Sequence, residues 1–366
     1  MMDIWMIFLR GIVFILGLGV VIGTVFSAIE TFVLPRSAPD PLTRLVFVTL
    51  RRLFTLRLKF MPKYLDRDRW MAFYAPIGLL TLVPTWYALV SIGYMGMYWA
   101  TGTKSWYQAW LLSGSSLLTL GFATPDQPIQ LPLVFSEAIL GLILVALLIA
   151  YLPTMYSAFS RREAAVTLLE VRAGDPPSAV EMLVRYNGIH GLSQLNKLWQ
   201  DWENWFADIE ESHTSLPALV FFRSPQPEHS WVTSSGAVLD AAALTLSAID
   251  IPADPQAQLC IRAGYLALRH ISDFFSLPYN PDPQFPRDPI SVSRLEFDQA
   301  CERLAAQGLP VKADREQAWL DFAGWRVNYD RVLLALAGIV MAPSAPWSTD
   351  RAQDNFTPPI FRSKTS

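Results

Sequence analysis

The chain has 366 residues, 52% of them hydrophobic, with a net charge of −3 and a mean hydropathy of +0.28. This composition excludes an ordinary soluble domain, because the apolar surplus is concentrated in the first 160 residues. Residues 1–170 hold 13 Lys/Arg and 9 Asp/Glu, whereas the remainder holds 16 and 23. We therefore expect a basic, membrane-embedded first half and an acidic soluble half. The two cysteines, Cys260 and Cys301, are too few for a disulfide framework and indicate a reducing compartment.

The first predicted membrane span is 11–29, an uncharged apolar stretch bracketed by Arg10 and Glu30. At 1.5 Å per residue it is about long enough to cross a hydrocarbon core of about 30 Å. A secretory signal peptide is the alternative, but its apolar core is normally shorter. Gly19 and Gly23 form a GxxxG pair, which either permits close helix packing or belongs to an ordinary membrane helix.

Two further spans follow, over 75–99 and 131–151. The second span is uncharged, and its far end is aromatic, as is typical of a bilayer interface. The third span contains a single charge, Glu137. The three stretches predict a multi-pass protein of the cell membrane.

The loops between the spans predict their orientation. Nine Lys/Arg and only three Asp separate the first two spans, while the loop over 101–130 holds one lysine and one aspartate. Because positive residues favour the cytoplasmic side, we expect the long basic loop and the C-terminal half to be cytoplasmic. The N-terminus and the 101–130 loop then lie outside.

The basic loop contains a predicted amphipathic helix over 41–60. Its cationic side chains lie near one helical face, with apolar residues around most of the rest. Such a helix is expected to lie along the anionic inner leaflet. The expected lipid contacts are Arg44, Arg51, Arg52 and Lys59.

The outer loop contains a short predicted helix over 105–116, followed by the apolar sequence TLGFA at 119–123. Since both flanking spans end at the outer surface, this segment must either dip into the membrane and return or lie on the surface. Irregular backbone at membrane depth is tolerated where it lines a watery cavity. The C-terminal end of the short helix carries a partial negative charge, which would favour a cation.

The order of span, short helix, Thr-x-Gly-Phe and span over about 70–165 resembles the pore module of potassium channels. TLGFA stands in the place of that family's Thr-Val-Gly-Tyr-Gly filter. The resemblance implies that potassium or another monovalent cation permeates a homotetramer, because each chain has one pore loop and four are needed. It also implies that filter carbonyls replace the ion's hydration shell and that two tryptophans brace them. The implied filter residues are Thr119, Leu120, Gly121, Phe122 and Ala123, and the bracing residues are Trp106 and Trp110.

Three residues depart from the family pattern. Ala123 replaces the second glycine, and a left-handed conformation there would cost an alanine about 1–2 kcal/mol. Phe122 replaces tyrosine, and Thr124 replaces the usual aspartate. We expect conduction, whereas these departures leave strict potassium selectivity open.

Three residues of the third span have alternative interpretations. Glu137 could bond to Ser113 or Ser115 behind the short helix, face the outer vestibule, or be a solvated end at the interface. Gly141 and Pro153 could form the hinge and kink of a gate. Alternatively, Pro153 marks the point where the span ends.

From residue 163 onward the spacing of apolar residues predicts helices separated by proline-rich breaks. The histidines are scattered without metal-ligand spacing, and no phosphate loop, nucleophile elbow or nucleic-acid-binding patch is found. We therefore expect neither an enzyme nor a cofactor. The loop at 221–231 could hold a small ligand through Arg223, Glu228 and His229, or be an ordinary polar loop.

The sequence predicts an all-α membrane protein with three transmembrane helices, a re-entrant pore helix and filter, and a helical cytoplasmic domain. We expect a tetrameric cation channel; the alternative is a non-conducting, channel-like scaffold or sensor. The predicted domains are an N-terminal span (1–34), a basic interfacial segment (35–70), a pore module (71–160), a cytoplasmic domain (161–342) and a flexible tail (343–366).

Overall fold

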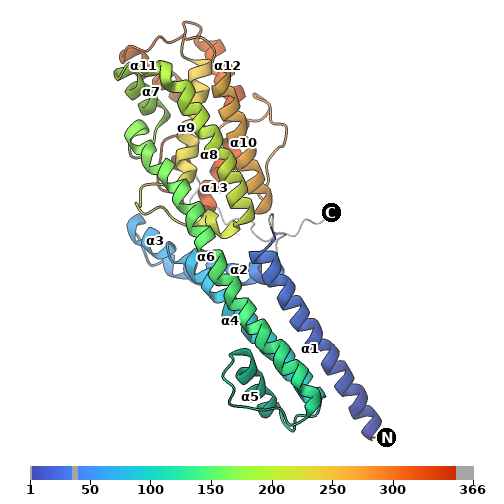
Figure 1. The fold of residues 1–366 in the computed structure, drawn as a ribbon. Helices are drawn as coiled ribbons and strands as arrows, with labels where there is room; N and C mark the ends of the chain where they lie inside the picture. The colour runs from blue at the N-terminus through green and yellow to red at the C-terminus, as the bar shows by residue number, and fades with distance from the viewer. Residues whose placement is uncertain (1, 35–39, 352–366) are drawn as a thin grey trace. The chain divides into compact units, whose positions relative to one another are not determined.

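The computed structural model describes residues 2–34 and 40–351, and these form helices joined by loops and turns (Figure 1). Within the described residues no strand occurs, and the one isolated antiparallel bridge joins Ile249 to Val311. The predicted all-α class is therefore confirmed.

Three helical stretches are long and apolar enough to cross a membrane: Ile4–Phe32, Tyr64–Ala100 and Pro128–Ala173. The first lies within helix α1 (Met2–Phe32), and the other two contain α4 (Tyr74–Ala100) and α6 (Leu131–Ala173). The lengths and the apolar composition of these helices confirm the predicted number and order of candidate spans.

The chain divides into two compact units. Unit 1 comprises Met1–Phe60 and Phe73–Ser157, and unit 2 comprises Met61–Ala72 and Ala158–Ser366. The long helix α6 contributes its first part to unit 1 and its C-terminal part to unit 2.

In unit 1, α1 packs against α4 where two glycines meet. A Cβ atom on Gly17 would lie 2.4 Å from the carbonyl oxygen of Gly93, so the helices could not approach as closely with a side chain there. Gly19 and Gly23, the GxxxG pair, have nothing within 4 Å of the position that a methyl group would occupy. The close contact therefore uses Gly17, which the sequence pattern did not single out.

Helix α2 (Pro41–Leu58) matches the expected amphipathic helix of the basic loop. It begins at Asp40, whose carboxylate accepts hydrogen bonds from the Thr43 amide at 2.7 Å and from Ser27 Oγ of α1 at 2.6 Å. Such a cap satisfies a backbone donor that the helix itself leaves unpaired. Ser27 Oγ also accepts a hydrogen bond from the indole of Trp86 in α4, so these bonds join the three helices.

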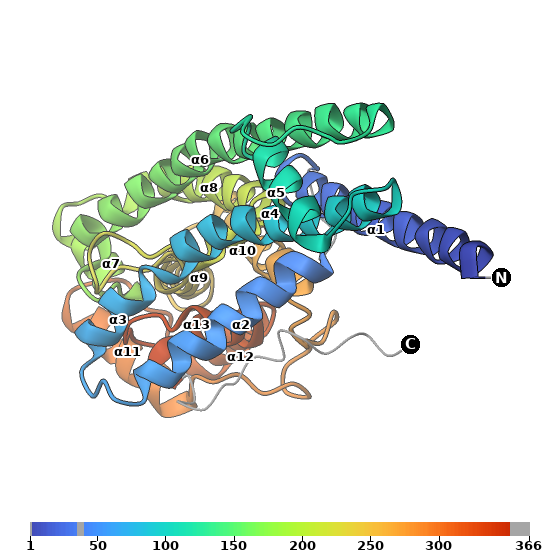
Figure 2. The same cartoon turned by 90° about the horizontal axis from the view of Figure 1, so that it is seen from below.

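Unit 2 is a helical bundle around α9 (Trp231–Ser247), which packs against α7, α10, α12 and α13 (Figures 1 and 2). Nearly every residue of α9 is buried, and most of its side chains are small or apolar, as expected of a central helix. The other α-helices that lie wholly in unit 2 are α3 (Tyr64–Met71), α7 (Ala179–Gly188), α8 (Leu195–Ser215), α10 (Pro255–Phe274), α11 (Arg294–Ala306), α12 (Arg315–Arg326) and α13 (Asp330–Val340). Short 3-10 turns occupy Pro128–Gln130 in unit 1 and Leu192–Gln194, Pro217–Phe221 and Thr349–Arg351 in unit 2.

Part of the predicted tail belongs to the folded bundle. Ala345 and Ser348 are buried, and Ser348 Oγ donates a hydrogen bond to the Ala345 carbonyl at 3.1 Å. The rest of that tail, 352–366, lies outside the described residues.

Candidate ion-conducting site

The short predicted helix is present as α5 (Trp106–Leu117), between candidate spans α4 and α6 (Figure 1). Ser105 caps its first turn, accepting a hydrogen bond from the Gln108 amide at 3.2 Å. On its buried face, Ser113 Oγ lies 2.8 Å from Ser91 Oγ of α4. Helix α5 is therefore a capped helix that packs on the preceding span.

The backbone turns sharply after α5. The Leu120 amide donates to the Ser115 carbonyl at 2.8 Å, so the chain folds back over the last turn of the helix. Thr119 and Gly121 have positive φ angles of 54° and 71°. Glycine adopts this left-handed conformation without a steric penalty, which gives Gly121 a specific backbone role.

Ser115 fixes the far side of this turn. Its Oγ accepts a hydrogen bond from the Ala123 amide at 3.0 Å. Ala123 does not have a positive φ, so the expected strain of an alanine at this position is absent. A glycine is therefore not required at 123 in this conformation, whereas Gly121 does occupy a left-handed position.

Glu137 of α6 is fully buried, and both of its carboxylate oxygens have partners in unit 1. Ser113 Oγ donates to Oε1 at 2.5 Å, and the Tyr98 hydroxyl donates to Oε2 at 2.7 Å. Of the three interpretations of Glu137, the structure agrees with the one in which the carboxylate bonds to Ser113 behind the short helix. The sequence does not predict Tyr98 as a partner. One turn earlier in α4, the hydroxyl of Tyr94 lies 2.8 Å from Oγ of Ser136, the residue before Glu137.

Gly141 lies where α6 meets the end of α5. A Cβ atom there would be 2.1 Å from the Leu117 carbonyl oxygen, and the Gly141 carbonyl accepts a hydrogen bond from Tyr87 at 2.7 Å. Gly141 therefore permits close packing of two helices, and its role as a hinge stays a prediction. Pro153 lies inside α6, which continues to Ala173.

Much of the candidate filter is exposed in the single chain. Leu120 and Phe122 are 60% and 62% exposed, and Leu118, just before the filter, is 50% exposed. The two tryptophans predicted to brace the filter are also about half exposed, Trp106 at 48% and Trp110 at 53%. Trp106 stacks on Trp99 of α4, with the ring centres 5.3 Å apart. Their bracing role therefore stays a prediction.

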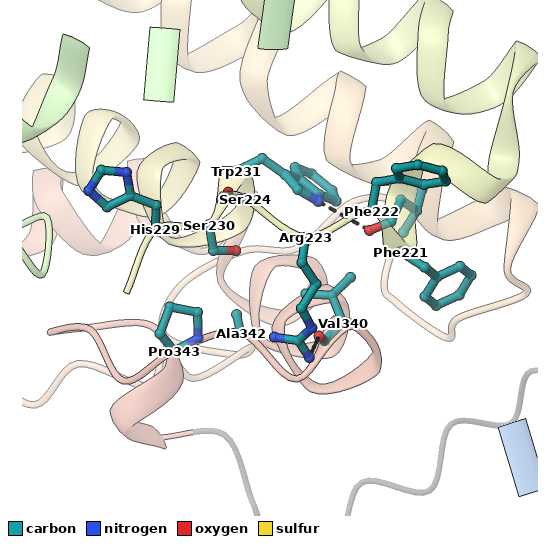
Figure 3. A pocket seen from close by; sticks show the side chains of 11 residues that line it. Phe221, Phe222, Arg223, Ser224, His229, Ser230, Trp231, Val340, Ala342 and Pro343 are labelled. Carbon is teal, nitrogen blue, oxygen red and sulfur yellow. Dashed lines mark hydrogen bonds between the residues drawn. The ribbon is translucent and has the colours of Figure 1, made fainter. Parts of the chain in front are cut away.

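The loop at 221–231 in unit 2 is anchored by its arginine. Arg223 donates to the Asp68 carboxylate of α3 at 2.5 Å and to the carbonyls of Val340 and Met341 at 2.8 and 3.1 Å. Arg223 and Val340 line a small pocket of about 20 Å³, room for about one water molecule (Figure 3). Arg223 therefore holds three segments of unit 2 together, which favours a structural role over ligand binding.

No protein-family model, curated protein or solved structure matches this chain. The resemblance to potassium channels thus rests on the order of the elements and on residues 119–123.

Proposed function

We propose that the chain is one subunit of a homotetrameric membrane channel that conducts monovalent cations, potassium foremost. The observation that carries this proposal is the turn after α5. A capped short helix between two candidate spans leads into left-handed Thr119 and Gly121, and Ser115 ties the turn back at Ala123. In the proposed tetramer, four such turns surround one axis, and their carbonyl oxygens replace the water around a cation.

The exposed apolar surface of unit 1 supports an assembly. Leu120 and Phe122 would be covered by neighbouring copies of the turn rather than remain in water. Several side chains of α6 are also exposed and would face lipid or a neighbouring subunit: Phe135, Ile139, Leu142 and Ile149.

The hydrogen bonds of Glu137 support a fixed position for α5. A buried carboxylate with two hydroxyl donors links α5 to α6 through Ser113 and to α4 through Tyr98. Groups that coordinate an ion must be held in place by their surroundings, because a displaced carbonyl no longer replaces water.

The proposed orientation follows the distribution of charge. The basic loop and unit 2 are cytoplasmic, and α2 lies along the inner leaflet with Arg44, Arg51, Arg52 and Lys59 near anionic lipid headgroups. The turn at 119–123 then opens to the outside.

Two measurements on the purified full-length protein test this proposal. Native mass spectrometry in detergent should give four copies, and proteoliposomes containing that species should release potassium faster than protein-free liposomes. A tetramer without flux of either potassium or sodium would instead support the alternative, a non-conducting scaffold or sensor.

A further inference from the structure

Three side chains that could bind a metal ion meet in unit 2: Glu170 near the C-terminal end of α6, Asp175 in the following turn, and His229 just before α9. One ligand atom from each lies within 4.8 Å of the other two. We propose that these residues bind a single divalent transition-metal ion of the zinc type. The site does not depend on the proposed conduction.

The backbone around two of the ligands is fixed by other contacts. Gly174, with a φ of +83°, ends α6 and donates from its amide to the Glu170 carbonyl at 2.8 Å. This left-handed turn directs the chain back, so that Asp175 lies beside Glu170. Arg185 of α7 donates to the carbonyls of Glu170 and Val171 at 3.1 and 2.9 Å. The carboxylates are thus brought together before any ion binds.

The distance between His229 and Glu170 fits a shared ion. Nε2 of His229 lies 3.4 Å from Oε2 of Glu170, longer than the usual 2.9–3.0 Å of a hydrogen bond. Two ligands that each lie about 2.0–2.2 Å from one zinc ion are separated by roughly 3.0–3.5 Å. Asp175 is exposed and can approach by side-chain rotation. The pair therefore has the separation of two ligands that share a metal.

The burial of the ligands also fits a metal site. The His229 side chain is 5% exposed, whereas that of Glu170 is 46% exposed, so an ion can enter from the carboxylate side. In Figure 3 the imidazole of His229 lies at one edge of the pocket, away from Arg223. One imidazole and two carboxylates leave at least one position for water, and imidazole favours zinc, copper or nickel over magnesium and calcium.

Another histidine of unit 2 shows what an ordinary ion pair looks like. Nδ1 of His270 lies 2.7 Å from Oε1 of Glu210, at hydrogen-bond distance, and the two side chains are 49% and 36% exposed. His270 is therefore a matched control for His229.

The test is a calorimetric titration of tag-free, full-length protein in detergent with Zn²⁺, after removal of metal by a chelator. We expect saturable binding of one Zn²⁺ per chain. Glu170→Gln, Asp175→Asn and His229→Gln should each weaken binding at least tenfold, whereas His270→Gln should leave it unchanged. The carboxylate variants are at exposed positions, so the test does not depend on the folding of the His229 variant.

Absence of saturable binding by the wild-type protein would overturn the proposal. Wild-type affinity in the Glu170 and Asp175 variants would also overturn it, as would an equal loss on His270→Gln. Melting temperatures measured with and without Zn²⁺ provide a second readout, because an ion bound only by the folded state raises the melting temperature.

Discussion

Ser113 of α5 and Glu137 of α6 are joined by a hydrogen bond of 2.5 Å between Ser113 Oγ and Glu137 Oε1. The other carboxylate oxygen accepts from Tyr98 of α4, so one buried side chain connects three helices of unit 1. Helix α5 is therefore linked to both candidate spans through this one side chain.

Replacement of Glu137 should loosen this connection. Glu137→Ala leaves two buried hydroxyl groups without their acceptor, at a cost of about 1–3 kcal/mol for each group that stays unpaired. Glu137→Gln keeps one acceptor oxygen and should lose less. We expect the melting temperature in detergent to be highest for wild type, intermediate for Glu137→Gln and lowest for Glu137→Ala. Asp126→Asn, which changes an exposed carboxylate in the loop between α5 and α6, should have the melting temperature of wild type. Wild-type melting of Glu137→Ala would contradict this role.

Gly141→Ala should displace the end of α5. The added methyl group would lie 2.1 Å from the Leu117 carbonyl oxygen, and the clash is with backbone, which cannot rotate away. Overpacking of this kind costs about 1–3 kcal/mol. Gly19→Ala is the matched control, since nothing lies within 4 Å of its added methyl group. A lower melting temperature is expected for Gly141→Ala only; equal melting of the two variants would show that α5 and α6 do not approach in this way.

The core of unit 2 should depend on Arg326. This fully buried guanidinium pairs with Asp240 of α9 and, at 2.8 Å, with Asp330 of α13. Burial alone would lower the pKa of Arg326, but the two carboxylates outweigh burial and raise the pKa. Arg326→Met leaves buried carboxylates without a counter-charge and should lower the free energy of unfolding by about 3–5 kcal/mol.

Arg287→Met tests whether this effect is specific to a buried pair. Arg287 pairs with Asp288 at the surface, where ion pairs contribute about 0–1 kcal/mol. We expect the free energy of unfolding, measured by chemical denaturation, to fall much more for Arg326→Met than for Arg287→Met. A small effect of Arg326→Met, similar to that of Arg287→Met, would refute the role of the buried pair.

His213 should make unit 2 less stable in mild acid. Burial, and then the positive charge of Arg162, hold the pKa of His213 well below its ordinary value. Nη1 of Arg162 lies 3.2 Å from Nε2 of His213, and because arginine can only donate, the imidazole is the acceptor and is neutral. Ser212 Oγ lies 3.2 Å from Nδ1, which carries the proton.

The sign of the effect follows from which state binds the proton. Below about pH 6.5 the unfolded chain protonates His213 while the folded chain does not, so stability falls as pH falls, by at most about 1.4 kcal/mol per pH unit. His213→Gln keeps an acceptor for Arg162 and removes this proton uptake. Its melting temperature should change less than that of wild type between about pH 7.5 and 5.5. Equal pH dependence in His213→Gln and wild type would contradict the account.

The sequence predicts the local features of unit 1 well. Long apolar runs delimit the spans, and the capped stretch at 105–116 becomes α5, because hydrophobic length and capping are local properties. The sequence leaves three interpretations of Glu137 open, and one of them includes the bond to Ser113. A carboxylate in a membrane span needs a partner, but the packing of the helices decides which way the side chain points. The contact of Gly17 with Gly93 depends on how two helices cross, which no local pattern specifies.

In unit 2 the missed features come from tertiary contacts. Local apolar spacing does not predict the break between α12, which ends at Arg326, and α13, which starts at Asp330. The break allows the hydroxyl of Tyr329 to reach Asp240 at 2.7 Å, 89 residues away in sequence. The start of α9 at Trp231, in contrast, has a local signal, because Ser230 is a typical cap residue before it.

The cluster of Glu170, Asp175 and His229 was missed for a similar reason. Its histidine is separated from both carboxylates by more than 50 residues, so the ligand spacing typical of a local metal motif is absent. Only the folded arrangement of α6 and the segment before α9 brings the three together.

The central claim is tested most directly by the current through purified tetramers in a planar bilayer, with potassium on one side and sodium on the other. We predict a cation current whose reversal potential is displaced toward that of potassium. Gly121→Ala should reduce the current, because alanine is strained at a φ of +71°, whereas Gly114→Ala, with open space around it, should preserve the current. Verified tetramers that carry no current in either cation would contradict the account.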